Sequence, residues 1–131
     1  MRTITKAELA EILDKHTKWL NDEDCGERAD LSHASLSGAD LSYANLSSAN
    51  LSYANLSGAN LDYCGFPLWC GSLHAHFDDR QIIQLIYHAV KAGVDSPNVS
   101  DGLKEVLYGL ADTANRFHRA NECGRIERIQ K

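Results

Sequence analysis

The residue types best suited to chemistry gather just beyond the middle of the chain. Two histidines, His74 and His76, precede a pair of aspartates, and imidazole and carboxylate groups are both ligands of zinc and related ions. The spacing matches no established metal motif. We therefore interpret the run as a polar loop in which Asp78 or Asp79 caps a following helix, and we expect neither a metal ion nor a cofactor.

A second candidate lies near the C-terminal end, where His118 and Cys123 offer an imidazole and a thiol. Nucleophilic catalysis would need the two groups within hydrogen-bond reach and a third group that orients the base. The sequence supplies no such context, and it contains no G-x-S-x-G, P-loop or dinucleotide-binding pattern. We expect a protein that is not an enzyme and has no catalytic residues.

Length and composition set the class of protein. The 131 residues, 44% hydrophobic and 24% charged, are typical of one soluble globular domain with at most an added subdomain. The N-terminus has no apolar run that would serve as a signal peptide, and no stretch approaches the roughly 20 apolar residues of a membrane span. We expect a cytoplasmic protein without a membrane partner. The four cysteines form no C-x-x-C pair, so reduced thiols are expected at Cys25, Cys64, Cys70 and Cys123.

Charge is distributed unevenly along the chain. The net charge of −5 disfavours direct binding to nucleic acid or anionic lipid, which needs clustered Lys and Arg. Between Arg28 and Arg80 there is no Lys or Arg, whereas aspartates occur at Asp30, Asp40, Asp62, Asp78 and Asp79.

That interval contains an internal repeat. Residues 29–68 divide into eight units of five, which read ADLSH, ASLSG, ADLSY, ANLSS, ANLSY, ANLSG, ANLDY and CGFPL. A small residue stands two positions before each central apolar residue. The central residues, which we expect to form the core, are Leu31, Leu36, Leu41, Leu46, Leu51, Leu56, Leu61 and Phe66.

A period of five suits neither an α-helix nor a flat strand. Each step of five turns a helical residue by about 140°, which spreads the leucines around the cylinder. On a strand an odd step sends successive leucines to opposite faces. An extended apolar–polar–apolar triplet followed by two polar corner residues fits instead, because it coils the chain around its own leucines.

These units resemble the pentapeptide-repeat family over 40 of the 131 residues. The resemblance implies a right-handed quadrilateral β-helix with four units per coil, and thus about two coils here. A 20-residue coil also agrees with the sequence, because residues 29–48 align with 49–68 so that Gly38 falls on Gly58 and Tyr43 on Tyr63.

The corner positions carry most of the aromatic residues of the repeat. His33, Tyr43, Tyr53 and Tyr63 alternate with glycine or serine corners. Tyrosine offers a large contact area at low entropy cost and is common in binding surfaces. The alternative is that stacked corner rings only stabilise the coil, and both interpretations stay open at this point.

Two coils need covered ends, because an open solenoid exposes backbone and apolar surface. The capping-box pattern at Thr5 and the apolar spacing after it predict a helix over residues 5–20. An acidic link follows, and helices are predicted from residues 78–80 to Gly93 and from Ser100 onward. We divide the chain into a capping helix and link (1–28), the repeat (29–68) and a helical subdomain with a basic tail (69–131). Part of its apolar surface is available for a homodimer seam.

The stretches FPLWCGSL, DDR with QLIYH, and ANRFHRANECGRI resemble small phage and prophage pentapeptide proteins, which implies a bacterial host. Similar proteins of the fluoroquinolone-resistance type mimic DNA toward gyrase, and other phage proteins act likewise on CRISPR nucleases. The first hypothesis is therefore an inhibitor of a host nucleic-acid-handling protein, of the anti-CRISPR or gyrase-inhibitor kind. The alternative is an adaptor that binds a protein through its Ser/Asn/Tyr surface without mimicry. The expected partner-binding residues are Asp22, Glu23, Asp24, Asp30, Asp40, Asp62, Tyr43, Tyr53 and Tyr63.

Overall fold

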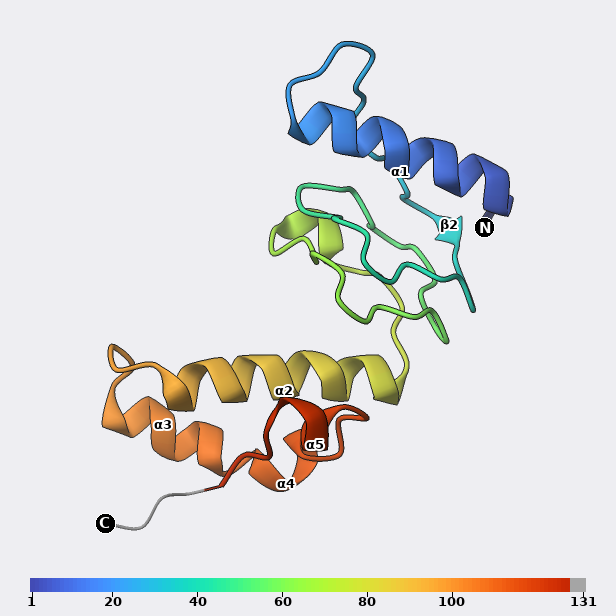
Figure 1. Ribbon diagram of the computed structural model, residues 1–131. Coiled ribbons are helices and arrows are strands. Elements are labelled where there is room, and N and C mark those ends of the chain that lie inside the picture. The colour runs from blue at the N-terminus through green and yellow to red at the C-terminus, as the bar shows by residue number, and fades with distance from the viewer. Residues whose placement is uncertain (128–131) are drawn as a thin grey trace. The chain divides into compact units, whose positions relative to one another are not determined.

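The computed structural model describes residues 1–127, which fall into two compact units, Met1–Asp78 and a second unit that begins at Asp79. No helix of the described range combines the length and hydropathy of a membrane-spanning segment. The elements, shown in Figure 1, are β1 (Arg2–Thr3), α1 (Lys6–Leu20), β2 (Ala34–Ser35), the 3₁₀ helix η1 (Cys70–Ser72), α2 (Asp79–Asp95), α3 (Asp101–Tyr108), α4 (Ala111–Ala114) and α5 (Ala120–Cys123).

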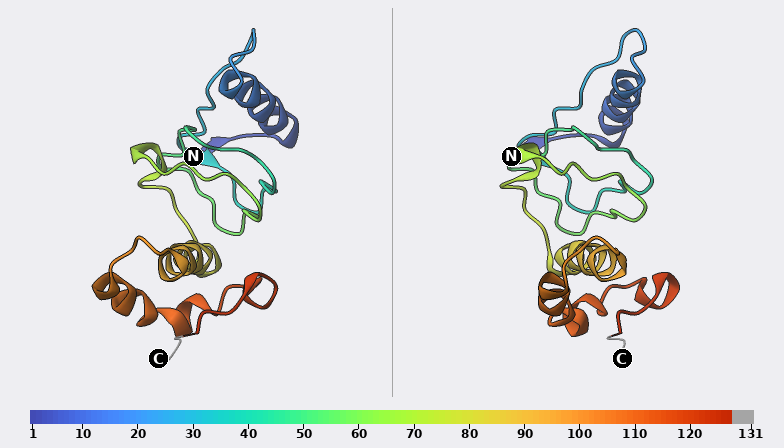
Figure 2. Two further views of the ribbon diagram at one scale, coloured as in Figure 1. Left: turned by 60° about the vertical axis from the view of Figure 1, so that its left-hand side comes forward. Right: turned by 90° about the vertical axis from the view of Figure 1, so that its left-hand side faces the viewer.

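Backbone pairing between residues about twenty positions apart organises the first unit. Asp30 bridges Asn50 in parallel, and Asp40 bridges Asn60 in the same way. The Leu31 N–H donates to the Asn50 carbonyl at 2.8 Å, and the Asn50 N–H donates to the Ala29 carbonyl at 3.0 Å. We call residues 29–48 the first row and residues 49–68 the second row. Both views of Figure 2 show these rows lying side by side.

The pairing takes the form of single bridges more than of strands. Of the predicted β-structure, only Ala34–Ser35 forms a regular strand, and it pairs in parallel with Arg2–Thr3. The reason is that the extended stretch of each unit is only three residues long. Within each pair, one residue, such as Asn50, supplies both the N–H and the carbonyl that bond to the facing row. The regular strands that a β-helix implies are therefore shorter than the repeat suggested.

Leucines from the first seven repeat units fill the space that the rows enclose. The seven repeat leucines are at most 7% exposed, while Phe66 is half-buried and packs against them. The small residues two positions earlier, such as Ala34, Ala49 and Ala54, are fully buried beside them. Leu9, Ile12 and Leu13 of α1 join the same core.

His16 ties α1 to the first row. Its side chain is fully buried, its Nδ1 accepts the Ala29 N–H at 3.0 Å, and its Nε2 lies 2.9 Å from the Ser47 carbonyl. Because the Ala29 N–H can only donate, Nδ1 carries no proton, and the neutral tautomer donates from Nε2. One imidazole thus supplies both an acceptor and a donor to the backbone.

The residues after the repeat also belong to the first unit. The Leu51 N–H donates to the Gly71 carbonyl at 2.7 Å, and Asn55 bridges His76 in parallel. We call residues 69–78 the third row. The first compact unit therefore ends at Asp78, ten residues later than the boundary at residue 68 that the repeat pattern predicts, because pairing continues after the leucine period stops.

The second unit packs around its own apolar cluster. α2 contacts both α3 and α4. It continues to Asp95, past the end predicted at Gly93. A Cβ at Gly93 would overlap Leu107 of α3, so this glycine serves close helix packing instead of ending the helix. The buried members of the cluster are Tyr87, Val90, Ala114, Phe117, Ala120 and Ile126.

Replacing His16 by Phe tests the tie between α1 and the first row. A buried aromatic ring is kept, but the Ala29 N–H and the Ser47 carbonyl lose their partners, which we expect to cost about 2–4 kcal/mol. Urea unfolding followed by tryptophan fluorescence reports on this unit, because Trp19 and Trp69 both lie in it. The exposed Lys18, whose Nζ lies 3.4 Å from Asp14, is the control, and Lys18→Ala should cost less than about 0.5 kcal/mol. Equal midpoints for both variants would contradict the role of His16.

Candidate interaction site

The corners of the repeat share one unusual backbone conformation. The φ angles of Tyr43, Ser48, Tyr53 and Tyr63 lie between 59° and 65°. This left-handed region favours glycine and costs other residues about 1–2 kcal/mol. At each corner the N–H of the following unit closes a four-residue turn, as between Ala44 and the Leu41 carbonyl at 3.1 Å. The turn tolerates tyrosine but does not require it.

The corner rings stack into two columns, which we call the aromatic columns. One contains His33, Tyr53 and His74, with ring centroids 5.0 Å and 4.9 Å apart. The other contains Tyr43 and Tyr63, with centroids 4.9 Å apart. These distances follow the spacing of paired rows. The structure thus aligns all three predicted tyrosines and adds His74, which sequence reasoning had placed in a polar loop.

The rings remain open to solvent although they stack. Tyr43 is 75% exposed, Tyr63 56% and Tyr53 46%. Stacked rings lie parallel, within 11° for Tyr43 and Tyr63, so their polar edges face outward while their flat faces contact each other. The columns therefore offer hydroxyl and imidazole groups as well as apolar area to a partner.

The repeat carboxylates mainly serve the local backbone. Asp30 Oδ1 accepts hydrogen bonds from the Ser32 hydroxyl at 2.6 Å and from the Ser32 N–H at 3.0 Å. Asp40 binds the Ser42 hydroxyl and N–H in the same way. These bonds, the hydroxyl first, lower the pKa of both carboxyls below the ordinary value of 3.8. Asn45 makes the same two contacts with Ser47, so an amide fulfils this role as well.

The third repeat carboxylate is not displayed. Asp62 is only 8% exposed, and its N–H donates to Asn60 Oδ1 at 3.0 Å. Of the three repeat aspartates predicted to contact a partner, the structure leaves only Asp30 and Asp40 exposed.

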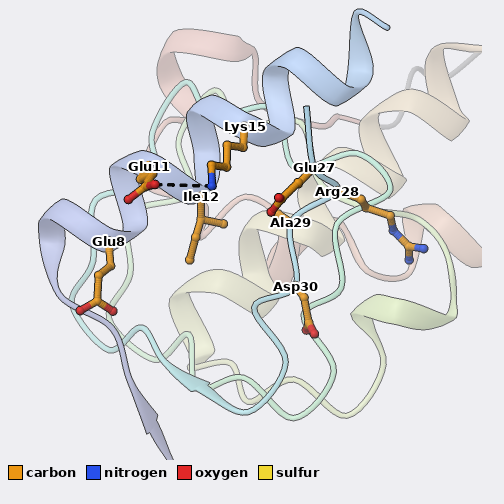
Figure 3. A pocket seen from close by; sticks show the side chains of 8 residues that line it. All are labelled: Glu8, Glu11, Ile12, Lys15, Glu27, Arg28, Ala29 and Asp30. Atoms are coloured by element: carbon orange, nitrogen blue, oxygen red, sulfur yellow. Dashed lines mark ion pairs between the residues drawn. The ribbon is translucent and has the colours of Figure 1, made fainter. Parts of the chain in front are cut away.

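The acidic link is exposed, and only its last residue, Glu27, lines a surface hollow together with the repeat aspartate Asp30. Asp22, Glu23 and Asp24 all face solvent. This hollow of about 350 Å³ opens between α1 and the start of the first row (Figure 3). Within it the Lys15 ammonium lies 3.5 Å from Glu11. Its charged lining comprises Glu8, Glu11, Glu27, Asp30, Lys15 and Arg28.

A tryptophan–arginine cluster is a surface feature that sequence reasoning missed. The Arg28 guanidinium lies 4.4 Å from the ring centroid of Trp69 and donates from Nε to the Ser48 carbonyl at 2.6 Å. Trp69 donates from Nε1 to the Ala49 carbonyl at 2.9 Å. The only sequence signal was that Arg28 is the last basic residue before a long gap. These contacts fix both side chains against the backbone.

The residues considered for metal binding or catalysis have other contacts. His74 stacks on Tyr53, and His76 pairs its backbone with Asn55. The Asp78 carboxylate accepts the Gly58 N–H at 2.7 Å. Within residues 1–127, no group of three His, Cys, Asp or Glu side chains is placed to hold a metal ion.

Within residues 1–127, His118 and the cysteines are not arranged as a catalytic group. The His118 ring packs edge-on against Phe117 with centroids 4.7 Å apart, and Cys123 is exposed at the end of α5. All four cysteines are free thiols. Burial raises the pKa of the Cys64 thiol, which keeps it in the unreactive protonated form.

The lowered carboxyl pKa values predict how stability depends on pH. A carboxyl whose folded pKa is depressed stabilises the fold above its unfolded pKa of about 4, and this contribution is lost as pH falls through the folded pKa. Replacing Asp30 and Asp40 by Asn keeps the Oδ1 acceptor and removes the titration. We expect the double variant to lose less stability than the wild type between about pH 4 and pH 2, measured by urea unfolding.

The matched control for this experiment is Asp22→Asn with Asp24→Asn, which changes the net charge equally in the exposed link. We expect it to keep the acid sensitivity of the wild type. The same acid-induced loss in both double variants would contradict a stabilising role for the serine–aspartate bonds.

Comparison with known proteins bears on the repeat alone. No curated protein and no solved structure matches the chain. The family model described as Pentapeptide repeats (8 copies) matches residues 27–63, which include the first row, the second row as far as Tyr63, and most of the aromatic columns. This part of the chain is therefore a pentapeptide-repeat segment.

Proposed function

We propose that the chain is a non-enzymatic protein-binding module whose contact surface is the pair of aromatic columns. In this proposal residues 29–68 form about two coils of a right-handed quadrilateral β-helix, α1 caps one end, and the helical C-terminal part completes the cap or forms a homodimer. The observation that carries the proposal is the solvent exposure of three tyrosines held in left-handed corner positions.

Energetics favour a role for these rings beyond folding. Each tyrosine at a positive φ costs about 1–2 kcal/mol, while one stacked aromatic pair returns only about 0.5–1.5 kcal/mol. Glycine occupies the equivalent corners at Gly38 and Gly58, with φ angles of 73° and 76°, so the turn forms without an aromatic residue. Tyrosine and histidine at the other corners thus bring little net stability, and an exposed recognition surface is what they add.

Nucleic-acid mimicry is the less favoured function. Mimicry needs a regular pattern of free carboxylates facing a basic groove, but Asp62 is nearly buried and Asp30 and Asp40 bind their own serines. An inhibitor of phage origin that acts on a nucleic-acid-handling host protein remains a prediction, as does a cytoplasmic location in a bacterium. Protein recognition through uncharged aromatic edges requires neither.

Removing the rings of one aromatic column tests the proposed surface. Asn tolerates the left-handed conformation better than other non-glycine residues, so Tyr43→Asn with Tyr63→Asn should retain the fold. Ser48→Asn, at a corner with φ 65° and no ring, is the matched control. In affinity capture from a bacterial lysate quantified by mass spectrometry, we expect the tyrosine variant to lose captured partners at least tenfold and the control to keep them. Equal capture by the two variants would contradict the proposal.

Salt and duplex DNA separate protein recognition from mimicry. Contacts through aromatic edges should vary less than about threefold in affinity between 50 and 200 mM salt, whereas a phosphate-mimicking contact falls much more steeply. We also expect duplex DNA to leave the captured complex intact, as measured by pull-down with added DNA. Displacement of the captured partner by DNA would favour mimicry instead, if the variant with Asp30→Asn plus Asp40→Asn also fails to capture that partner.

A further inference from the structure

The outer edge of the first row is only partly covered. In a parallel ladder, the pairing groups of neighbouring residues point to opposite sides. The Ala39 carbonyl and the Leu41 N–H pair with Asn60 of the second row, at 2.9 Å each. The N–H and carbonyl of Asp40 therefore point away from the second row, toward the side on which α1 lies.

On the first two faces, N-terminal residues already contact this edge. The Asp30 carbonyl accepts a hydrogen bond from Arg2 Nη2 at 2.7 Å. On the next face, Thr3 of β1 pairs with Ser35. On the third face, the Asp40 backbone N–H and carbonyl make no hydrogen bond within residues 1–127. An extended edge with an unused donor and acceptor is a template for another strand.

A hollow lies directly beside this open edge. It has a volume of about 360 Å³ between the first turn of α1 and residues 35–40 of the first row. Its lining combines the apolar Ile4, Leu9, Leu36 and Ala39 with the polar Thr5, Lys6, Ser35 and Ser37. Asn45 has the same unused backbone groups on the fourth face, but it does not line this hollow.

We propose that the open edge at Asp40 binds an extended segment of another protein by adding a short parallel strand to the first row. The segment has an apolar–polar–apolar pattern. Its two apolar residues direct their backbone groups to Asp40 and their side chains into the hollow, while its central polar residue faces solvent.

The chemistry of the edge identifies the occupant. The free N–H and carbonyl of Asp40 can bond to the backbone of an extended segment. A helix cannot bind in this way, because its own N–H and carbonyl groups already bond to each other within the helix. A second copy of this chain lacks a free segment of the required pattern in the described range, because the triplets of the repeat bury their apolar residues in their own core. The exposed Tyr43 follows three residues later, so the same partner can reach the aromatic columns.

This inference rests on the proposed protein-binding function and names the backbone recognition that accompanies it. The two fail separately. If the tyrosine variant loses capture but no peptide binds at Asp40, the proposed protein-binding function stands and the proposed strand addition at Asp40 fails.

The test uses the full-length chain, labelled with ¹⁵N, and the acetylated, amidated peptide Thr-Val-Thr-Val-Thr as probe. We expect saturable shifts of the amides of residues 36–41, with the Asp40 amide shifted downfield and protected from exchange. The analogue that is N-methylated at both Val residues cannot donate to the Asp40 carbonyl, and it should bind about tenfold more weakly or worse. Equal binding of the two peptides, or no shift at Asp40 with millimolar peptide, would overturn the proposal.

Asp40→Pro removes the edge donor, and Asn45→Pro is its matched control. Each substitution deletes an N–H that the fold does not use and a side-chain acceptor that binds the serine two residues later. We expect only Asp40→Pro to lose peptide binding. Equal loss in both variants would overturn the proposal, and so would concentration-dependent shifts of the Asp40 amide without peptide, which would place a second copy of the chain at the edge. The N-methylated peptide decides the question on the wild type if a proline variant does not fold.

Discussion

Every row of this protein depends on the alternation of its backbone pairing groups. Because neighbouring residues direct their N–H and carbonyl groups to opposite sides, a row that pairs fully with the next row still has half of its groups facing the other way. For the first row these groups face no further row, and isolated side chains supply most of the partners. The Arg2 guanidinium, the His16 imidazole and the Arg28 guanidinium all donate to carbonyls of this edge. The N-terminal residues are thus part of the repeat's hydrogen-bond network, although they have none of its sequence pattern.

The same geometry decides which side chains reach solvent. A unit of five residues turns the chain at a left-handed corner, so the corner side chain projects outward and stacks on the corner of the next row. The Asp or Asn that precedes each leucine also faces out, but its short side chain bends toward the serine two residues later. Aromatic corners therefore form continuous exposed columns, whereas the aspartates between them are held close to the backbone. The protein has acidic residues in its repeat without presenting a row of free carboxylates.

The repeat, the burial of its leucines and the first helix follow from sequence alone, since a five-residue leucine period has few structural solutions and Thr5 is a strong capping signal. The third row was missed because its pairing runs at an offset of 21 instead of 20, as from Asn55 to His76, and its residues lack the leucine that marks the repeat. The role of His16 could not be predicted, because its two backbone partners lie 13 and 31 residues away in the sequence. The site was anticipated at the tyrosines but not at the open edge, which depends on where each backbone group points.

The offset of the third row has a consequence for how such a chain can grow. Rows that differ by twenty residues present the same environment to each other, so a duplicated block of twenty residues would find its partners already in register, and the molecule would lengthen without refolding its neighbours. One additional residue lies between Gly65 and Gly71, yet the later positions stay in line, because His74 stacks on Tyr53 and His76 pairs with Asn55. A block copied after this point would therefore still find corners in line with its own, and a single inserted residue is taken up within one row without ending the solenoid.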